Sequence, residues 1–62
     1  MHPLEQEIQY IVEQCTLGNI SNDETVYLLN EIKEIRAAQE CAGNEVMCRH
    51  LVECCNIALK LV

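Results

Sequence analysis

The chain has 62 residues, half of them apolar, and its ten acidic and four basic side chains give a net charge of −6. A chain of this length has room for one domain and buries only roughly 60% of the surface that its unfolded state exposes. The negative charge repels phosphate backbones and anionic lipids, which argues against direct nucleic-acid or membrane binding and favours protein partners with basic surfaces. The same acidity would also keep a small apolar protein in solution.

The sequence carries no sign of export or membrane insertion. Residues 1–5 contain neither a basic region nor an apolar run, so no signal peptide is predicted. The most apolar stretch, 44–62, is interrupted by Arg49, Glu53 and Lys60 within fewer than the roughly 20 residues that a bilayer requires. An odd number of cysteines, five, fits reduced thiols better than a disulfide framework. We therefore expect a cytoplasmic protein.

The first predicted helix covers about residues 3–17. Pro3 suits a first helical turn, where its missing N–H is not needed, and Gly18 suits a helix end. The apolar residues between them recur at intervals of three and four, as in an amphipathic helix. They are Leu4, Ile8, Ile11 and Cys15, with Val12 beside them. A helix this short is marginal alone, so it must dock on the rest of the chain.

The second predicted helix covers about residues 22–42. Ser21 and Glu24 form a capping-box pattern, in which the serine hydroxyl accepts from the Glu24 N–H and the glutamate reaches back. The expected apolar face consists of Leu28, Ile32, Ile35, Ala38 and Ala42, with Val26, Leu29 and Ala37 beside it.

The third predicted helix covers about residues 45–62. Gly43 and Asn44 predict a tight hairpin before it, with glycine ending one helix and asparagine capping the next. A single kinked helix is the alternative, because an interior glycine costs only about 1 kcal/mol relative to alanine. The third helix carries two adjacent apolar rows: Met47, Leu51, Cys54, Ala58 and Leu61, and Cys48, Val52, Cys55, Leu59 and Val62.

Two apolar rows on one helix require more than one neighbour to cover them. The predicted fold is therefore an all-α, single-domain bundle of three helices, with a helical hairpin formed by the second and third and with the third in the centre. The high apolar fraction for so short a chain also favours self-association, so we expect a homodimer.

No catalytic or cofactor-binding motif stands out, and we expect a non-enzymatic protein without a cofactor. The cysteines form no C-x-x-C pair, and most lie on the apolar rows, where a thiol behaves as a small hydrophobe. The weaker alternative is a metal site, for which Cys41, Cys48, His50 and Cys54 are the candidates. His50 and Cys54 are four residues apart and so share a helical face.

Protein binding is the function that the surface pattern favours. Exposed tyrosines are common at interfaces, and carboxylates at helical spacing suit a basic partner. The candidate partner-binding residues are Tyr10, Tyr27, Glu24, Glu31 and Glu34. We therefore expect a small regulator or inhibitor that acts through an acidic helical surface. The nucleic-acid-binding site of another protein is one surface that it could cover. A self-assembling structural subunit and a Cys/His metal or redox sensor are the alternatives.

Overall fold

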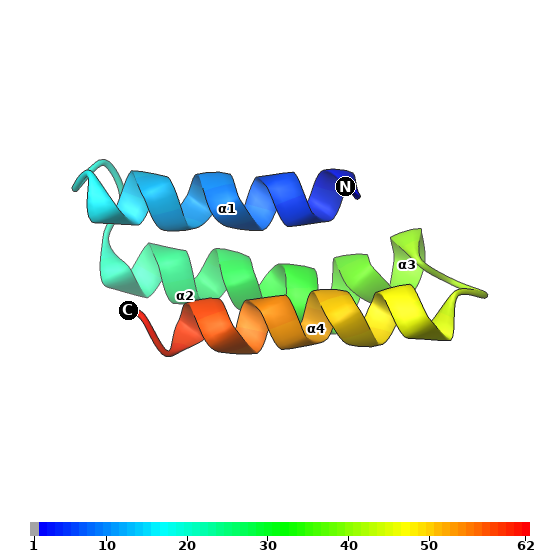
Figure 1. Ribbon diagram of the computed structural model, residues 1–62. Helices are drawn as coiled ribbons and strands as arrows, with labels where there is room; N and C mark the ends of the chain where they lie inside the picture. Colours follow the sequence, from blue (N-terminus) through cyan, green and yellow to red (C-terminus); the bar gives the residue numbers. More distant parts are fainter. Residues whose placement is uncertain (1) are drawn as a thin grey trace.

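The computed structural model describes residues 2–62 as three helical rods (Figure 1). The first rod is α1 (Pro3–Thr16) and the last is α4 (Glu45–Leu59). Between them, α2 (Asn22–Glu31), the π-helical turn η1 (Ile32–Arg36) and α3 (Ala37–Glu40) follow one another without a break. Successive rods run in opposite directions. The all-α bundle predicted from the sequence is confirmed.

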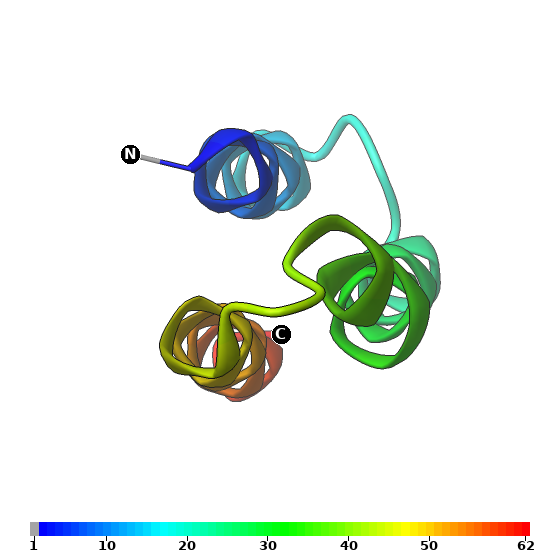
Figure 2. The same ribbon diagram turned by 90° about the vertical axis from the view of Figure 1, so that its right-hand side faces the viewer.

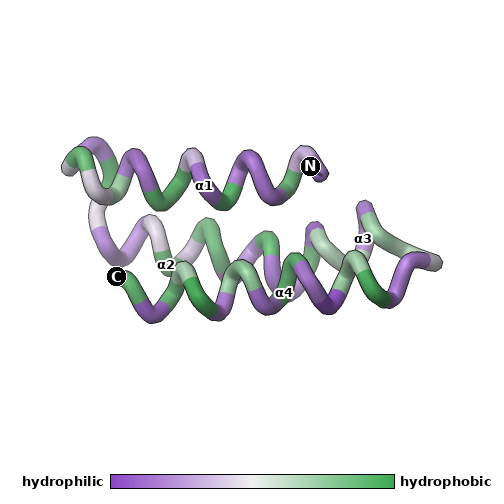
Figure 3. Tube along the Cα trace, viewed as in Figure 1, coloured by the Kyte–Doolittle hydropathy of each residue, from purple (hydrophilic) through white to green (hydrophobic). Residues whose placement is uncertain are grey.

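The three rods lie at the corners of a triangle when viewed along the bundle (Figure 2). Each rod packs against the other two, and the bundle measures 36 × 19 × 16 Å. Polar and apolar residues alternate along every rod at helical spacing (Figure 3), as expected for helices that each bury one side. The two apolar rows predicted on the last helix thus have the two neighbours that they require.

Side chains cap the start of each rod. His2 Nδ1 accepts a hydrogen bond from the Leu4 N–H at 3.0 Å, directly before Pro3. Ser21 Oγ accepts from the Glu24 N–H at 3.1 Å, which is the first half of the predicted capping box. The second half, from the Glu24 carboxylate back to the Ser21 N–H, does not form in residues 2–62.

Two glycines end the first two rods. Gly18 has φ +80° and Gly43 has φ +86°, in the left-handed region that glycine enters without a steric penalty. Asn44 then caps α4 by accepting from the Met47 N–H at 3.1 Å. The tight hairpin predicted at Gly43 and Asn44 is therefore present, and the alternative of one kinked helix is wrong.

The core lies along the axis between the rods. Its fully buried members include Leu29 and Ile32 from the middle rod, with Leu51 and Cys55 from α4. The other buried apolar residues are Leu4, Ile8, Ile11, Ala37, Cys41 and Ala58. Thr25 is also fully buried, and its hydroxyl donates to the Ser21 carbonyl at 2.7 Å, so its polar atom is satisfied.

The π-helical turn corrects the predicted face of the middle rod. The Ala37 N–H donates to the Ile32 carbonyl, five residues back, instead of four as in an α-helix. The buried positions are consequently Ile32, Ala37 and Cys41, and no longer follow regular α-helical spacing. Three residues expected in the core face outward instead: Ile35, which is 52% exposed, Ala38 and Ala42. Thr25, which the sequence did not predict as core, lies inside.

The last rod is buried over less of its surface than the sequence suggested. Ile57 is 56% exposed, and Leu61, expected on a buried row, is 71% exposed in the turn that follows α4. Within residues 2–62, no helix combines the length and apolar character needed to cross a bilayer.

Candidate functional site

Three surface features have the geometry to bind something, and the first is a shallow groove on the middle rod. We call it the acidic groove; it has a volume of about 270 Å³. It is lined by Tyr27, Asn30, Glu31, Glu34 and Ile35. Three of these are residues that the sequence singled out for partner binding. The π-helical turn contributes Glu34 and Ile35, and it places Ile35 on this outer face.

Within residues 2–62, no cationic side chain pairs with the carboxylates of the acidic groove. Lys33 and Arg36 lie on the same rod, but both are engaged elsewhere. Lys33 Nζ donates to Asn56 Oδ1 on α4 at 3.1 Å. Arg36 binds Glu7 on α1 at 2.6 Å and Glu40 at 3.3 Å, and these carboxylates raise the pKa of its guanidinium. In the described part of the chain, Glu31 and Glu34 form no ion pair.

The two remaining candidates for partner binding fall in different places. Glu24 is exposed near the start of α2 and lies seven residues, or two helical turns, before Glu31. It therefore extends the stripe of the acidic groove. Tyr10 is 61% exposed on α1 and does not line the groove, whereas Tyr27 is 66% exposed within it. The structure thus groups four of the five candidates on one helical stripe.

The second feature is a mostly apolar groove between α1 and α4, with a volume of about 380 Å³. We call it the apolar groove. Its lining residues are Ile8, Gln9, Val12, Glu13, Cys54, Ile57, Ala58 and Leu61. The exposed side chains of Ile57 and Leu61 contribute to it. The sequence placed Leu61 on a buried row, so the groove is the unfilled remainder of that row.

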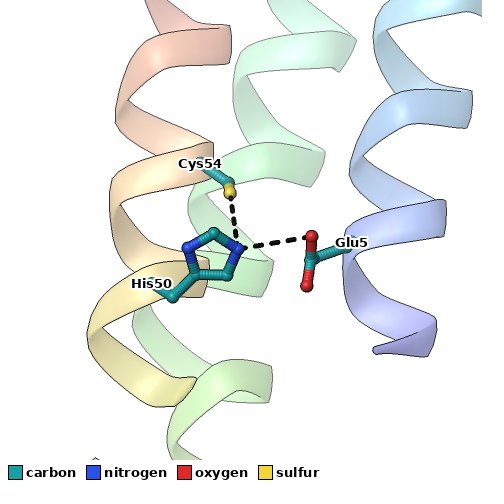
Figure 4. Close-up of side chains that lie close together, drawn as sticks. All are labelled: Glu5, His50 and Cys54. Carbon is teal, nitrogen blue, oxygen red and sulfur yellow. Dashed lines mark hydrogen bonds and ion pairs between the residues drawn. The ribbon is translucent and has the colours of Figure 1, made fainter. Parts of the chain in front are cut away.

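The third feature is a cluster of three different potential metal ligands. Glu5 comes from α1, whereas His50 and Cys54 come from successive turns of α4, and the three side chains point toward one another (Figure 4). His50 Nε2 lies 3.3 Å from Glu5 Oε2 and 3.7 Å from Cys54 Sγ. The Glu5 side chain is 18% exposed and that of His50 is 53% exposed, so solvent reaches the cluster from one side.

Three thiols of the bundle, those of Cys41, Cys54 and Cys55, are held protonated by their surroundings. Burial raises the pKa of Cys54, and the nearby charges of Glu5 and Glu53 raise it further. Burial also raises the pKa of Cys55 and of Cys41. A raised thiol pKa lowers the thiolate fraction and hence the reactivity, which argues against these cysteines as nucleophiles.

The four residues proposed as a possible metal site do not come together. Cys48 lies in the first turn of α4, and Cys41 precedes that helix and lies beside His2. The Cys48 thiol donates to the Cys41 carbonyl at 2.9 Å, and Cys41 Sγ lies 3.6 Å from His2 Nε2. His2 uses its Nδ1 as the acceptor that caps α1, so its Nε2 carries the proton of the neutral ring.

Sequence reasoning missed Glu5 as a neighbour of His50 and Cys54. The spacing of four residues within α4 is visible in the sequence, but the position of α1 along α4 is not. Periodicity gives the face that a helix buries and says nothing about its longitudinal register against another helix. Ile35 was missed because its exposure depends on the π-helical turn.

Searches against protein families, curated proteins and solved structures find no match for this chain.

Proposed function

We propose that the protein is a small, non-enzymatic regulator that binds another protein through the acidic groove. The partner would present an arginine or lysine side chain to Glu31 and Glu34 and an apolar side chain to Tyr27 and Ile35. Such a surface occurs on nucleic-acid-binding proteins, because the cations that grip phosphate also grip carboxylate. The proposed role is then to occupy that surface and exclude the nucleic acid.

One observation carries the proposal: the groove combines exposed apolar side chains with carboxylates that have no cation of their own. A carboxylate already paired within the chain would have to lose that partner before binding another. Glu31 and Glu34 do not face this cost, since Lys33 and Arg36 bind elsewhere. The two apolar side chains supply the contact area that a charge pair alone lacks. The five free thiols also fit a reducing compartment such as the cytoplasm.

The test is an NMR titration of the isotope-labelled protein with a synthetic amphipathic helical peptide of leucine and arginine. We expect the largest amide shifts between residues 24 and 35. Tyr27→Ala should lower the affinity for the peptide at least tenfold. Tyr10→Ala, which alters a similarly exposed tyrosine on α1, should leave the affinity unchanged. Shifts centred on α1 and α4, or equal effects of the two tyrosines, would contradict the proposal.

A second function, self-association, is favoured by the apolar groove. Its lining contains one charged residue, Glu13, so it offers a basic partner few ion pairs. Another apolar surface would fit it better. We propose a second copy of the chain as the occupant, with Ile57 and Leu61 of each copy entering the groove of the other. This dimer leaves the acidic groove free, because the two grooves lie on different rods.

Sedimentation equilibrium of the reduced protein tests the dimer. Leu61→Gln should shift the mass to that of a monomer. Val46→Gln, which alters an 80% exposed residue outside the groove, should leave the dimer intact. A wild-type monomer at high micromolar concentration, or equal behaviour of the two variants, would rule out this dimer.

A further inference from the structure

The cluster of Glu5, His50 and Cys54 has the dimensions of a metal site. Zinc is bound at about 2.0–2.1 Å by histidine nitrogen, about 2.0–2.2 Å by carboxylate oxygen and about 2.3 Å by thiolate sulfur, usually in tetrahedral geometry. Tetrahedral angles then separate nitrogen from oxygen by about 3.3–3.5 Å and nitrogen from sulfur by about 3.5–3.6 Å. The separations in the structure are 3.3 Å and 3.7 Å.

The third separation, between the Glu5 carboxylate oxygen and the Cys54 sulfur, is no more than 4.8 Å. A tetrahedral zinc site requires about 3.6 Å there, so the site needs the Glu5 side chain to turn slightly toward the thiol. The ligands come from two rods: Glu5 from the first turn of α1, and His50 and Cys54 from one face of α4. In Figure 4 the imidazole lies between the carboxylate and the thiol, with Nε2 facing both.

We propose that Glu5, His50 and Cys54 bind one zinc ion, with water as the fourth ligand. The Cys54 thiol releases its proton to solvent as the Zn–S bond forms, and His50 binds through Nε2 in its neutral form. One thiolate and one carboxylate then balance the two positive charges of the ion. The exposed side of His50 provides the entry path and the space for the water.

The site would fasten α1 to α4. Besides the buried side chains of its inner face, α1 is tied to the middle rod by the contact between Glu7 and Arg36 and to α4 by the contact between Glu5 and His50, which a shared ion would replace with stronger bonds. An ion that needs both rods binds the folded chain and not the unfolded one, so it stabilises the bundle by mass action. This inference does not depend on the acidic groove, which lies on another rod, and the two can fail separately.

The experiment uses the full reduced chain, freed of metal by a chelator and titrated with zinc against a chromogenic competitor. We expect one zinc per chain. Cobalt should reproduce the stoichiometry and give a thiolate-to-metal charge-transfer band. Zinc should also raise the midpoint of thermal unfolding, which is a readout independent of the competitor.

Single substitutions then test each ligand. His50→Asn, Cys54→Ser and Glu5→Gln should each weaken zinc by more than the roughly 10- to 100-fold that loss of an outer-shell partner costs. His50 is more than half exposed, so His50→Asn leaves the packing intact. Matched controls are Cys15→Ser and Glu45→Gln, which alter a thiol and an exposed carboxylate outside the cluster and should leave the affinity unchanged.

Several results would overturn the proposal. One is a wild-type chain that binds no zinc, or binds several equivalents weakly and without a charge-transfer band for cobalt. Another is zinc binding that survives both His50→Asn and Cys54→Ser. A third is binding lost in Cys48→Ser and retained in Cys54→Ser, because the ion would then lie near the start of α4, outside the proposed cluster. Circular dichroism of each variant establishes that it has folded.

Discussion

Cys55 is fully buried on α4, where its thiol packs as a small apolar side chain among leucine and isoleucine. Burial raises the pKa of this thiol, and the neighbouring Cys54 adds to the effect. The unfolded chain exposes the same thiol to water, where it ionises more readily. The free energy of unfolding therefore depends on the ionisation of this one side chain.

The link predicts a loss of stability at alkaline pH. An acid whose pKa is higher in the folded state holds its proton more tightly there. Its stabilising effect is fully present below the ordinary thiol pKa of 9.0 and is lost as the pH rises through the raised value. Urea unfolding at pH 7 and pH 10 should show this decline, and Cys55→Ala should make it smaller. An identical decline in both proteins would contradict the assignment.

A buried and an exposed leucine show how much burial alone contributes to stability. Leu51 is fully buried, whereas Leu61 is 71% exposed. Leu51→Ala should lower the free energy of unfolding by about 2–5 kcal/mol, because it removes buried methyl groups and leaves a cavity. Leu61→Ala should change the unfolding of the monomer by no more than about 0.5 kcal/mol. Urea unfolding below the concentration at which the chain dimerises measures both, and equal losses would contradict this core.

The π-helical turn η1 is the element that decides which face of the middle rod is buried. The buried residue that follows Ile32 is Ala37, five positions later, and the next is Cys41. A regular helix would bury residues three or four positions apart. The turn therefore accommodates one extra residue, and Ile35 is placed outside as a result.

Deletion of Ile35 tests this description of the rod. It leaves Ala37 four positions after Ile32 and Cys41 eight positions after it, so a regular α-helix buries all three. We expect an unchanged helix content and a free energy of unfolding within about 1 kcal/mol of the wild type.

Deletion of Ala38, another exposed residue of the same rod, is the control. Either the π-turn stays and Cys41 rotates by about 100°, or the turn is lost and Ala37 leaves the buried face. This deletion should cost at least about 2 kcal/mol in urea unfolding. A greater loss on deletion of Ile35 than of Ala38 would show that the rod does not depend on spacing in this way.

The local features of the elements could be predicted from the sequence. Pro3, Gly18, Ser21 and Asn44 mark helix ends through their own backbone and side-chain chemistry, and the structure has helix ends at each of them. The π-turn could not be predicted, because every residue within it also suits an α-helix. The tertiary packing of Ala37 and Cys41 selects it.

The candidate sites were predictable to the extent that they lie within one helix. Glu24, Tyr27, Glu31 and Glu34 follow one stripe of the middle rod, so helical spacing alone groups them. The cluster of Glu5 with His50 and Cys54 joins two rods, and its formation depends on how far α1 is displaced along α4. That displacement is set by the packing of the whole bundle and could not be predicted from the spacing of residues within one helix.

At the scale of the whole molecule, charge and apolar surface are separated by rod. The middle rod presents carboxylates without cations in the acidic groove, while α1 and α4 enclose the apolar groove and the Glu5–His50–Cys54 cluster. Net charge alone would give weak, diffuse attraction for any cation. The proposed function requires instead that binding depend on the position of particular carboxylates.

The most direct measurement is therefore the affinity of the leucine–arginine peptide for two variants of equal net charge. Glu31→Gln combined with Glu34→Gln removes two carboxylates from the acidic groove, whereas Glu45→Gln combined with Glu53→Gln removes two exposed carboxylates from α4. The proposal predicts at least a tenfold loss of affinity for the first pair and little change for the second. Equal losses would show that net charge alone attracts the peptide and would contradict a binding site in the acidic groove.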